Sequence, residues 1–367
     1  TGWLDRRLEA SLPRLDAAGV NVVVQAAWIE RGVDDPRGRA LGKLKRLRTM
    51  VQQSRQRAAI VTGPDQLEAV LREGRLAVVL ALEGGTALVD GEASLAELRK
   101  LGVSMFGLTW SESSPYADSS SEPRRPGGLT EAGRAAVAWC NQKGAMIDVS
   151  HMSDRATQQT IELSTAPVIA SHSNARAVCD VPRNLPEPLI RAIASKGGLV
   201  GAMFHGPFVR SDRKATRADV VGMIRHLVDV AGPAHVGIGS DWDGIIQAPL
   251  GLAGPSDLPL LWRDLEAAGL DAGVVSGISG ANFLRYWRAV WEARAPLEAV
   301  AVAEPPSDPR TPPTTSLPSD CSRPDQCMEP YLSFIDRARG RAQPADRDAL
   351  WDRMWAIVDG AVQPEAA

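Results

Sequence analysis

The feature that most constrains the fold is a series of short, almost continuously apolar runs that alternate with amphipathic stretches. Such runs, rich in Val, Ile, Leu and Ala, are typical of parallel strands buried on both faces. The predicted strands are 20–26, 76–82, 103–109, 145–150, 167–171, 198–204 and 235–240. The predicted helices are 38–56, 64–72, 92–100, 131–142, 154–162, 186–196, 217–230 and 258–268. This alternation predicts an α/β fold with a parallel sheet.

Two arrangements of such strands are open. A closed (β/α)8 TIM-type barrel needs eight strands, whereas an open doubly wound sheet could use the seven that are predicted. Doubly wound sheets commonly carry a Gly-rich phosphate turn, and no G-x-G-x-x-G follows the early strands here. The segment 4–18 has the pattern of a helix that follows a strand. We therefore favour the barrel and expect its first strand to be absent from this chain.

Length and composition limit the classes of protein that fit. The 367 residues suit one large α/β domain with an appendage, and a net charge of −3 gives no basic field for binding nucleic acid. No apolar stretch approaches the roughly 20 residues that a membrane-spanning helix needs, so we expect no transmembrane segment. The predicted divisions are a barrel over 1–302, a Pro-rich linker over 303–319 and a helical tail over 320–367. Thr130 and Asp154 are expected to cap the helices that follow them.

Two cysteines bear on the compartment. Cys321 and Cys327 close a short loop in the C-terminal part of the chain. A disulfide between them would indicate an oxidising compartment, periplasmic or extracellular, whereas two reduced thiols would fit a cytoplasmic protein. The sequence leaves both alternatives open.

Two histidines follow predicted strands at the end where barrel enzymes carry their chemistry. His151 comes after the run 145–150, and His172 comes 21 positions later after the run 167–171. A single such histidine is more often a hydrogen-bonded structural residue, but two at corresponding strand ends favour a site. Imidazole is a good ligand for zinc and its first-row neighbours, so we predict a metal site here.

Three further residues are candidates for this site. Glu83 ends a buried strand, where it is either a metal ligand or the partner in a buried ion pair or helix cap. Asp241 follows the last strand and could transfer protons, or it could simply be a turn residue. Arg183, in a loop after His172, could bind a carboxylate, although a solvated surface arginine is the default expectation.

Taken together, these residues resemble the membrane dipeptidase (renal dipeptidase) family of zinc peptidases. The resemblance runs from about Leu12 to about Trp291 and depends on the order and spacing of its motifs. These motifs are Leu-Glu83-Gly-Gly, Asp-Val-Ser-His151, Ser-His172-Ser-Asn-Ala, Arg183-Asn184, Gly-Ser-Asp241-Trp-Asp-Gly, Tyr116-Ala117-Asp118-Ser119, 127–131 and 280–284.

The resemblance implies a (β/α)8 barrel of the metal-dependent hydrolase kind with two zinc ions, which hydrolyses dipeptides with a metal-activated water, including dipeptides with D-residues. Glu83 would bridge both metals, and His151 and His172 would complete the second metal site. Arg183 would bind the substrate carboxylate. Asp241 would shuttle the proton and hold the amino end of the substrate. The expected partner is a small dipeptide, and a homodimer is possible.

The chain departs from the family pattern in two ways. The family's first strand ends in His-x-Asp, which holds the first metal, and no His-x-Asp occurs in this sequence. The family also commonly has a histidine where Trp110 stands, so Trp110 is expected to contact substrate without an imidazole's chemistry. These departures leave two alternatives open: a catalytically impaired relative that acts as a binding or scaffold protein, and a related metallohydrolase acting on another amide or a lactone.

Overall fold

The computed structural model describes residues 9–54, 56–122 and 127–294. The predicted linker and tail, with Cys321 and Cys327, lie outside the described residues. So do residues 4–8 of the helix predicted over 4–18. The strands are β1 (Val22–Trp28), β2 (Ala58–Ile60), β3 (Leu76–Glu83), β4 (Val103–Gly107), β5 (Met146–Asp148), β6 (Ile169–Ala170), β7 (Leu199–Met203) and β8 (Val236–Gly239).

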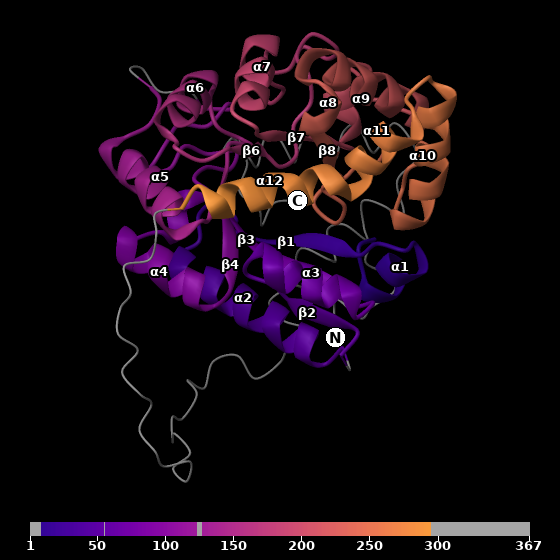
Figure 1. Cartoon of the computed structure of the whole chain (residues 1–367). Coiled ribbons are helices and arrows are strands. Elements are labelled where there is room, and N and C mark those ends of the chain that lie inside the picture. Colours follow the sequence, from indigo (N-terminus) through magenta and orange to yellow (C-terminus); the bar gives the residue numbers. More distant parts are fainter. Residues whose placement is uncertain (1–8, 55, 123–126, 295–367) are drawn as a thin grey trace, which may run out of the picture. The chain divides into compact units, whose positions relative to one another are not determined.

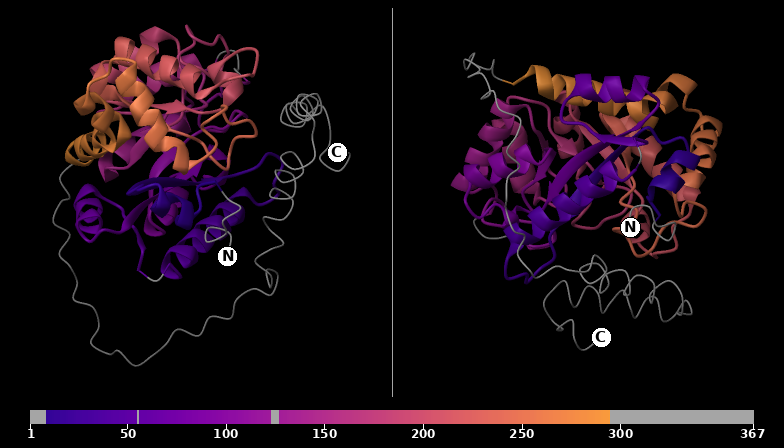
Figure 2. Two further views of the ribbon diagram at one scale, coloured as in Figure 1. Left: turned by 90° about the vertical axis from the view of Figure 1, so that its right-hand side faces the viewer. Right: turned by 90° about the horizontal axis from the view of Figure 1, so that it is seen from below.

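The strands form one sheet in which all ladders are parallel. Its order is β1-β3-β4-β5-β6-β7-β8, with β2 paired to β3 beside this path. The order therefore follows the chain without the reversal that defines a doubly wound sheet, so that alternative is wrong. The sheet is curled and covered by helices, as predicted for a barrel of the TIM type (Figures 1 and 2).

The two ends of the sheet path are β1 and β8. Within the described residues no ladder joins these two strands, so the curl is not closed there. The burial of the strands agrees with this arrangement, because β3 is buried along almost its whole length whereas most of β1 is half-buried or exposed. The position of the opening is where the sequence analysis expected an absent strand.

Most of the helices cover the outer face of the sheet, and their hydrophobic sides share one large core with it, whereas the buried residues of α3 and α12 belong to a second core. The helices of the described residues are α1 (Leu12–Ala17), α2 (Pro36–Gln52), α3 (Pro64–Arg72), α4 (Glu92–Lys100), α5 (Glu131–Lys143), α6 (Asp154–Leu163), α7 (Glu187–Ser195), α8 (Gly206–Val209), α9 (Arg217–Ala231), α10 (Leu258–Ala267), α11 (Ala272–Ser276) and α12 (Asn282–Glu292). The described residues hold no helix long and apolar enough to cross a membrane.

The predicted helix caps are half right. Thr130 caps α5, because its side chain accepts a hydrogen bond from the backbone N–H of Gly133 at 3.1 Å. Asp154 was expected to cap α6, but Ser153 does so by accepting from the N–H of Ala156. Serine is as good a cap as aspartate, so Asp154 moves one place along, into the first turn of the helix.

The inner face of the sheet has a second core that the sequence analysis did not anticipate. Alternate residues of β3, beginning with Ala77 and Val79, pack here against Tyr286, Trp287 and Val290 of α12. Figure 1 shows α12 running across the strands. Because side chains alternate along a strand, the next residues of this face towards the carboxyl end of β3 are Ala81 and then Glu83. The apolar core thus gives way to polar chemistry at that end of the sheet.

Candidate metal centre

A row of four residues crosses the inner face at the carboxyl ends of neighbouring strands. Trp28 of β1 is in register with Glu83 of β3, Glu83 with Gly107 of β4, and Gly107 with Asp148 of β5. Residues in register on parallel strands send their side chains to the same face of the sheet. Glu83 therefore lies between Trp28 on one side and, across the side-chain-free Gly107, Asp148 on the other.

Glu83 meets His151 and His172 in a tight cluster. Its Oε1 is 3.1 Å from Nε2 of His151 and 3.5 Å from Nε2 of His172, and the two Nε2 atoms are 3.0 Å apart. A tetrahedral zinc ion held at about 2.0–2.1 Å by nitrogen and oxygen sets its ligand atoms about 3.3 Å apart. The three atoms thus form one face of a zinc-sized tetrahedron, and the donor set fits the metal.

Strand ends and unusual backbone geometry bring these side chains together. His151 lies three residues beyond β5 and His172 two residues beyond β6. His151 has a positive φ of 68°, and Asp241, two residues beyond β8, has a φ of 57°. Residues other than glycine rarely adopt this left-handed conformation, and where they do, function is a common reason. The turns that follow the strands therefore aim both side chains.

The protonation states of Glu83 and His151 suit metal ligands. Burial tends to raise the pKa of Glu83, but hydrogen bonds from His151 and His172 outweigh it, so the pKa lies well below its usual range. Burial, together with the charge of Arg183, lowers the pKa of His151 to about 3. Glu83 is therefore ionised and His151 neutral at pH 7, which are the forms that bind metal. At His172 burial tends to lower the pKa, but the hydrogen bond to Glu83 outweighs it and the pKa is raised, so zinc would have to displace a proton there.

Asp148 and Ser171 orient His172, and the sequence analysis did not identify either residue. Ser171 donates its hydroxyl hydrogen to Oδ2 of Asp148, and its oxygen lies 2.7 Å from Nδ1 of His172. Since the serine hydrogen is used towards Asp148, Ser171 must accept from Nδ1–H of His172, and in the neutral ring that binds metal Nε2 therefore has the lone pair. Asp148 also accepts the backbone N–H groups of Ser150 and Ser171 at 2.9 Å each. The sequence contained a signal: an aspartate that ends a buried strand, three residues before His151.

Arg183 and Asp241 lie around the same cluster. Arg183 is buried, so the expectation of a solvated surface arginine is wrong; it donates to the carbonyl of His172 at 2.8 Å and to Ser173 Oγ at 2.9 Å. Its Nε is buried and has no hydrogen-bond partner in the described part of the chain. Burial raises the pKa of Asp241 to about 6, with the charges of His172, Glu83 and Arg183 acting on it. All of the predicted polar site residues are thus brought to one place.

Trp110 stands beside the cluster in an aromatic arrangement that includes Trp28. The rings of Trp110 and His151 are 6.3 Å apart, and those of Trp110 and Trp28 meet edge to face at 4.9 Å. Lys43 Nζ lies 4.9 Å from the Trp28 ring and donates to the Trp28 carbonyl at 2.7 Å. Trp28 was not predicted to lie at the site, because the strand that ends with it was expected to end two residues earlier.

The other histidines are not among the clustered metal-ligand candidates, although His205, two residues beyond β7, stands at the same rim of the sheet. His226 pairs with Glu187 at 3.1 Å, and His235 bonds the Gly198 carbonyl at the amino end of β8. His205 is buried against Phe208, with ring centroids 4.7 Å apart. Of the described residues, only Glu83, His151 and His172 form a group of three or more such donors close enough to share a metal.

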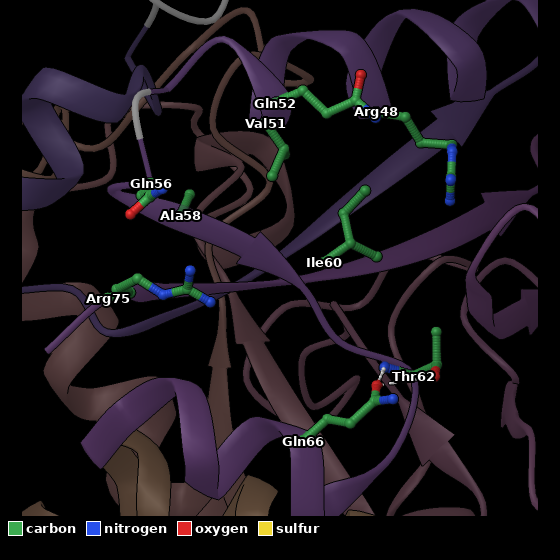
Figure 3. A pocket seen from close by; sticks show the side chains of 9 residues that line it. All are labelled: Arg48, Val51, Gln52, Gln56, Ala58, Ile60, Thr62, Gln66 and Arg75. Atoms are coloured by element: carbon green, nitrogen blue, oxygen red, sulfur yellow. Dashed lines mark hydrogen bonds between the residues drawn. The ribbon is translucent and has the colours of Figure 1, made fainter. Parts of the chain in front are cut away.

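A separate cavity of about 420 Å³ lies at β2, away from the cluster. It is lined by Arg48, Val51, Gln52, Gln56, Ala58, Ile60, Thr62, Gln66 and Arg75 (Figure 3). Its polar groups are partly engaged, since Arg48 donates to the Leu101 carbonyl and Gln66 accepts from Thr62. We assign it no role.

Comparison with known proteins agrees with this geometry. Residues 4–300 match the family described as membrane dipeptidase (peptidase family M19). Dipeptidase 3 of Mus musculus is 35% identical over 240 residues, which cover 64% of this chain and 48% of the mouse protein. An uncharacterized protein in the pqqA 5′ region of Klebsiella pneumoniae is 34% identical over 256 residues, covering 67% of this chain and 94% of that protein. The chain thus spans about half the length of mouse and rat dipeptidase 3.

Two solved structures have the same fold. The dipeptidase AC, a metallopeptidase, superposes with a TM-score of 0.74 at 27% identity, covering 78% of this chain and 90% of its own. A metallopeptidase from Rhodobacter sphaeroides, liganded with a phosphinate mimic of the dipeptide L-Ala-D-Ala, gives 0.73 at 27% identity, covering 78% and 92%. The family match extends over most of the sequence and includes every residue of the cluster. This chain therefore belongs to the membrane dipeptidase family, peptidase family M19.

Proposed function

We propose that this chain hydrolyses dipeptides with the help of zinc held by Glu83, His151 and His172. The observation that carries the proposal is the convergence of one carboxylate and two imidazole nitrogens, 3.0–3.5 Å apart, at the carboxyl end of a curled parallel sheet. When bound, zinc acts as a Lewis acid and makes water a nucleophile near neutral pH. Because the family's first-site His-x-Asp does not occur in this sequence, we assign residues to one zinc site only.

The chain's own residues supply the remaining roles. The buried Nε of Arg183 is a donor without a protein partner among the described residues, which suits it to receive the substrate carboxylate. Asp241, with a pKa raised to about 6 by burial, can take up a proton near neutral pH and return it to the leaving amine. The same carboxylate can hold the substrate's amino group. Trp110, half-buried beside His151, contacts the substrate on the His151 side of the cluster.

Dipeptides with a D-residue at the carboxyl end are included in this proposal. The relative from Rhodobacter sphaeroides binds a mimic of L-Ala-D-Ala and shares the fold at 27% identity. L-Ala-D-Ala and L-Ala-L-Ala are therefore the first substrates to compare.

The test is hydrolysis of both dipeptides by zinc-supplemented protein. Replacing Asp241 by Asn should lower kcat by roughly 100-fold or more, because the proton acceptor is lost, while zinc remains bound. Asp264→Asn is the matched control, since Asp264 pairs with Arg217 on another part of the sheet's helical cover. Absence of turnover with either dipeptide, in protein that holds zinc, would reject the proposed activity.

One observation favours a second function. Trp110 stands where an imidazole is common in the family, and its ring packs against Trp28 instead of offering an acid or a base. A relative that binds dipeptides but turns them over poorly would have this feature. Under that alternative, dipeptides bind to the zinc-loaded protein with little hydrolysis, and Trp110→His increases kcat.

A further inference from the structure

We infer that Trp28, together with Trp110, forms an aromatic wall that selects dipeptides with an aromatic side chain. This inference concerns the same site as the proposed function and rests on that proposal for the identity of the ligand. Trp28 would thus be a specificity-determining residue, distinct from the residues that hold zinc or move protons.

The sheet register places Trp28 at the site. Trp28 pairs with Glu83 across parallel strands, so the two side chains leave the same face of the sheet from neighbouring positions. On its other side Glu83 meets Gly107 and then Asp148, which supports His172. Trp28 therefore bounds the cluster on the side opposite to Asp148.

The second ring of the wall continues from Trp28 towards His151. Trp110 meets Trp28 at an interplanar angle of 63° with centroids 4.9 Å apart, and it lies 6.3 Å from His151 at 47°. Edge-to-face contact at this distance is a favourable aromatic geometry. Both tryptophans are half-buried, so neither is fully enclosed by the protein.

The surroundings of Trp28 fix the position of its ring. Lys43 lies over the ring, with Nζ 4.9 Å from the ring centroid, and also donates a 2.7 Å hydrogen bond to the Trp28 carbonyl. The charge of Lys43 is balanced by Glu30 at 2.7 Å. A ring held in this way offers a pre-formed surface, which costs a ligand little ordering entropy.

The arrangement of charges in the site decides which part of the ligand meets this wall. Arg183 and Asp241 act at the His172 side, where they would engage the charged ends of a dipeptide. The indole rings offer an apolar surface on the side of Glu83 and His151. A side chain that projects towards them gains by burying apolar area, and a flat ring gains most because it can also stack.

The test is calorimetric binding of phosphinate dipeptide mimics to the zinc-loaded protein. Mimics with a methyl or a benzyl side chain are compared at each of the two residue positions. We expect the benzyl mimic to bind roughly 10-fold or more tightly than the methyl mimic at one position, the size of effect typical of added apolar contact in a pocket. Trp28→Ala should reduce that ratio to near one, and Trp28→Phe should retain most of it.

The ratio is insensitive to partial unfolding, because both mimics are measured on the same preparation. Trp262→Ala is the matched control; this half-buried tryptophan lies on α10 and should leave the ratio unchanged. Equal affinity of the wild-type protein for both mimics, no binding of either mimic, or an unchanged ratio in Trp28→Ala would each overturn the inference. A Trp28-dependent ratio in protein that hydrolyses no dipeptide would reject the proposed activity alone.

Discussion

Replacing Asp148 by Asn should disable the zinc site while leaving its three ligands in the sequence. In the wild type, Oδ1 of Asp148 accepts two backbone N–H groups and Oδ2 accepts the hydroxyl of Ser171. The backbone donors hold the carbonyl oxygen of an asparagine in the Oδ1 position, so its NH₂ group must face Ser171. Ser171 then accepts from the amide and turns its own hydrogen towards Nδ1 of His172.

The consequence is a change of tautomer at His172. Once Nδ1 accepts a hydrogen bond, Nε2 must carry the ring hydrogen, and it loses the lone pair that faces Glu83 and His151. Loss of such support to a metal-ligating histidine typically costs 10–100-fold in metal affinity. By the relation between affinity and free energy, this is about 1.4–2.7 kcal/mol.

The assay is the zinc dissociation constant of Asp148→Asn, measured by competition with a chelator, with circular dichroism as the check of folding. Asp264→Asn, which changes a carboxylate engaged with Arg217, is the control and should bind zinc as the wild type does. Ser171→Ala removes the relay without forcing the wrong tautomer, so its loss should be smaller. A folded Asp148→Asn protein with wild-type zinc affinity would refute the tautomer argument.

Two further predictions concern stability and geometry. Burial alone would raise the pKa of Glu30, but hydrogen bonds from Arg39 and Lys43 lower it from 4.5 to about 2. The ionised Glu30 therefore stabilises the fold fully above about pH 4.5, and this stabilisation is lost as the pH falls towards 2. Between pH 7 and pH 3, the free energy of unfolding measured with urea should therefore fall by about 1–2 kcal/mol less in Glu30→Gln than in the wild type, with allowance made for the partial exposure of the pair. Identical pH dependence of the two proteins would contradict this prediction. At Gly239 in β8, an added methyl group would overlap the Ser171 carbonyl and Cα of His172. Gly239→Ala should thus weaken zinc binding. Gly222→Ala is the control, because an added methyl group there meets open space. Equal zinc affinities of Gly239→Ala and the wild type would argue against this packing.

Much of the fold and of the site could be predicted because they depend on patterns along the chain. Continuous apolar runs marked all seven strands of the main path, and parallel topology then required their carboxyl ends to share one rim. The residues that follow those runs, such as Glu83, His151, His172 and Asp241, were consequently expected to meet. Local pattern and global fold agree for these residues.

What could not be predicted depends on exact boundaries and on contacts across the sheet. The first strand was expected to end at residue 26 but ends at Trp28, and this shift of two residues kept Trp28 out of the site. Strand β2 lies in a run of only four apolar residues, 58–61, which is shorter than the runs that predicted the other strands. The link from Asp148 through Ser171 to His172 joins residues 23 apart in the sequence, and only the folded sheet brings them together. The same holds for α12, whose buried aromatic residues pack on the inner face of the sheet.

The claim that Glu83, His151 and His172 hold the functional metal is tested most directly by counting zinc. Purified protein, its His172→Ala variant and its His226→Ala variant are each loaded with zinc, dialysed and analysed by mass spectrometry for metal per chain. His226 is the matched control because it bonds Glu187 and lies outside the cluster. The account predicts about one zinc in the wild type and in His226→Ala, and a loss of most of it in His172→Ala, in line with a site that needs all of its ligands. Equal zinc content in the wild type and in His172→Ala would contradict it.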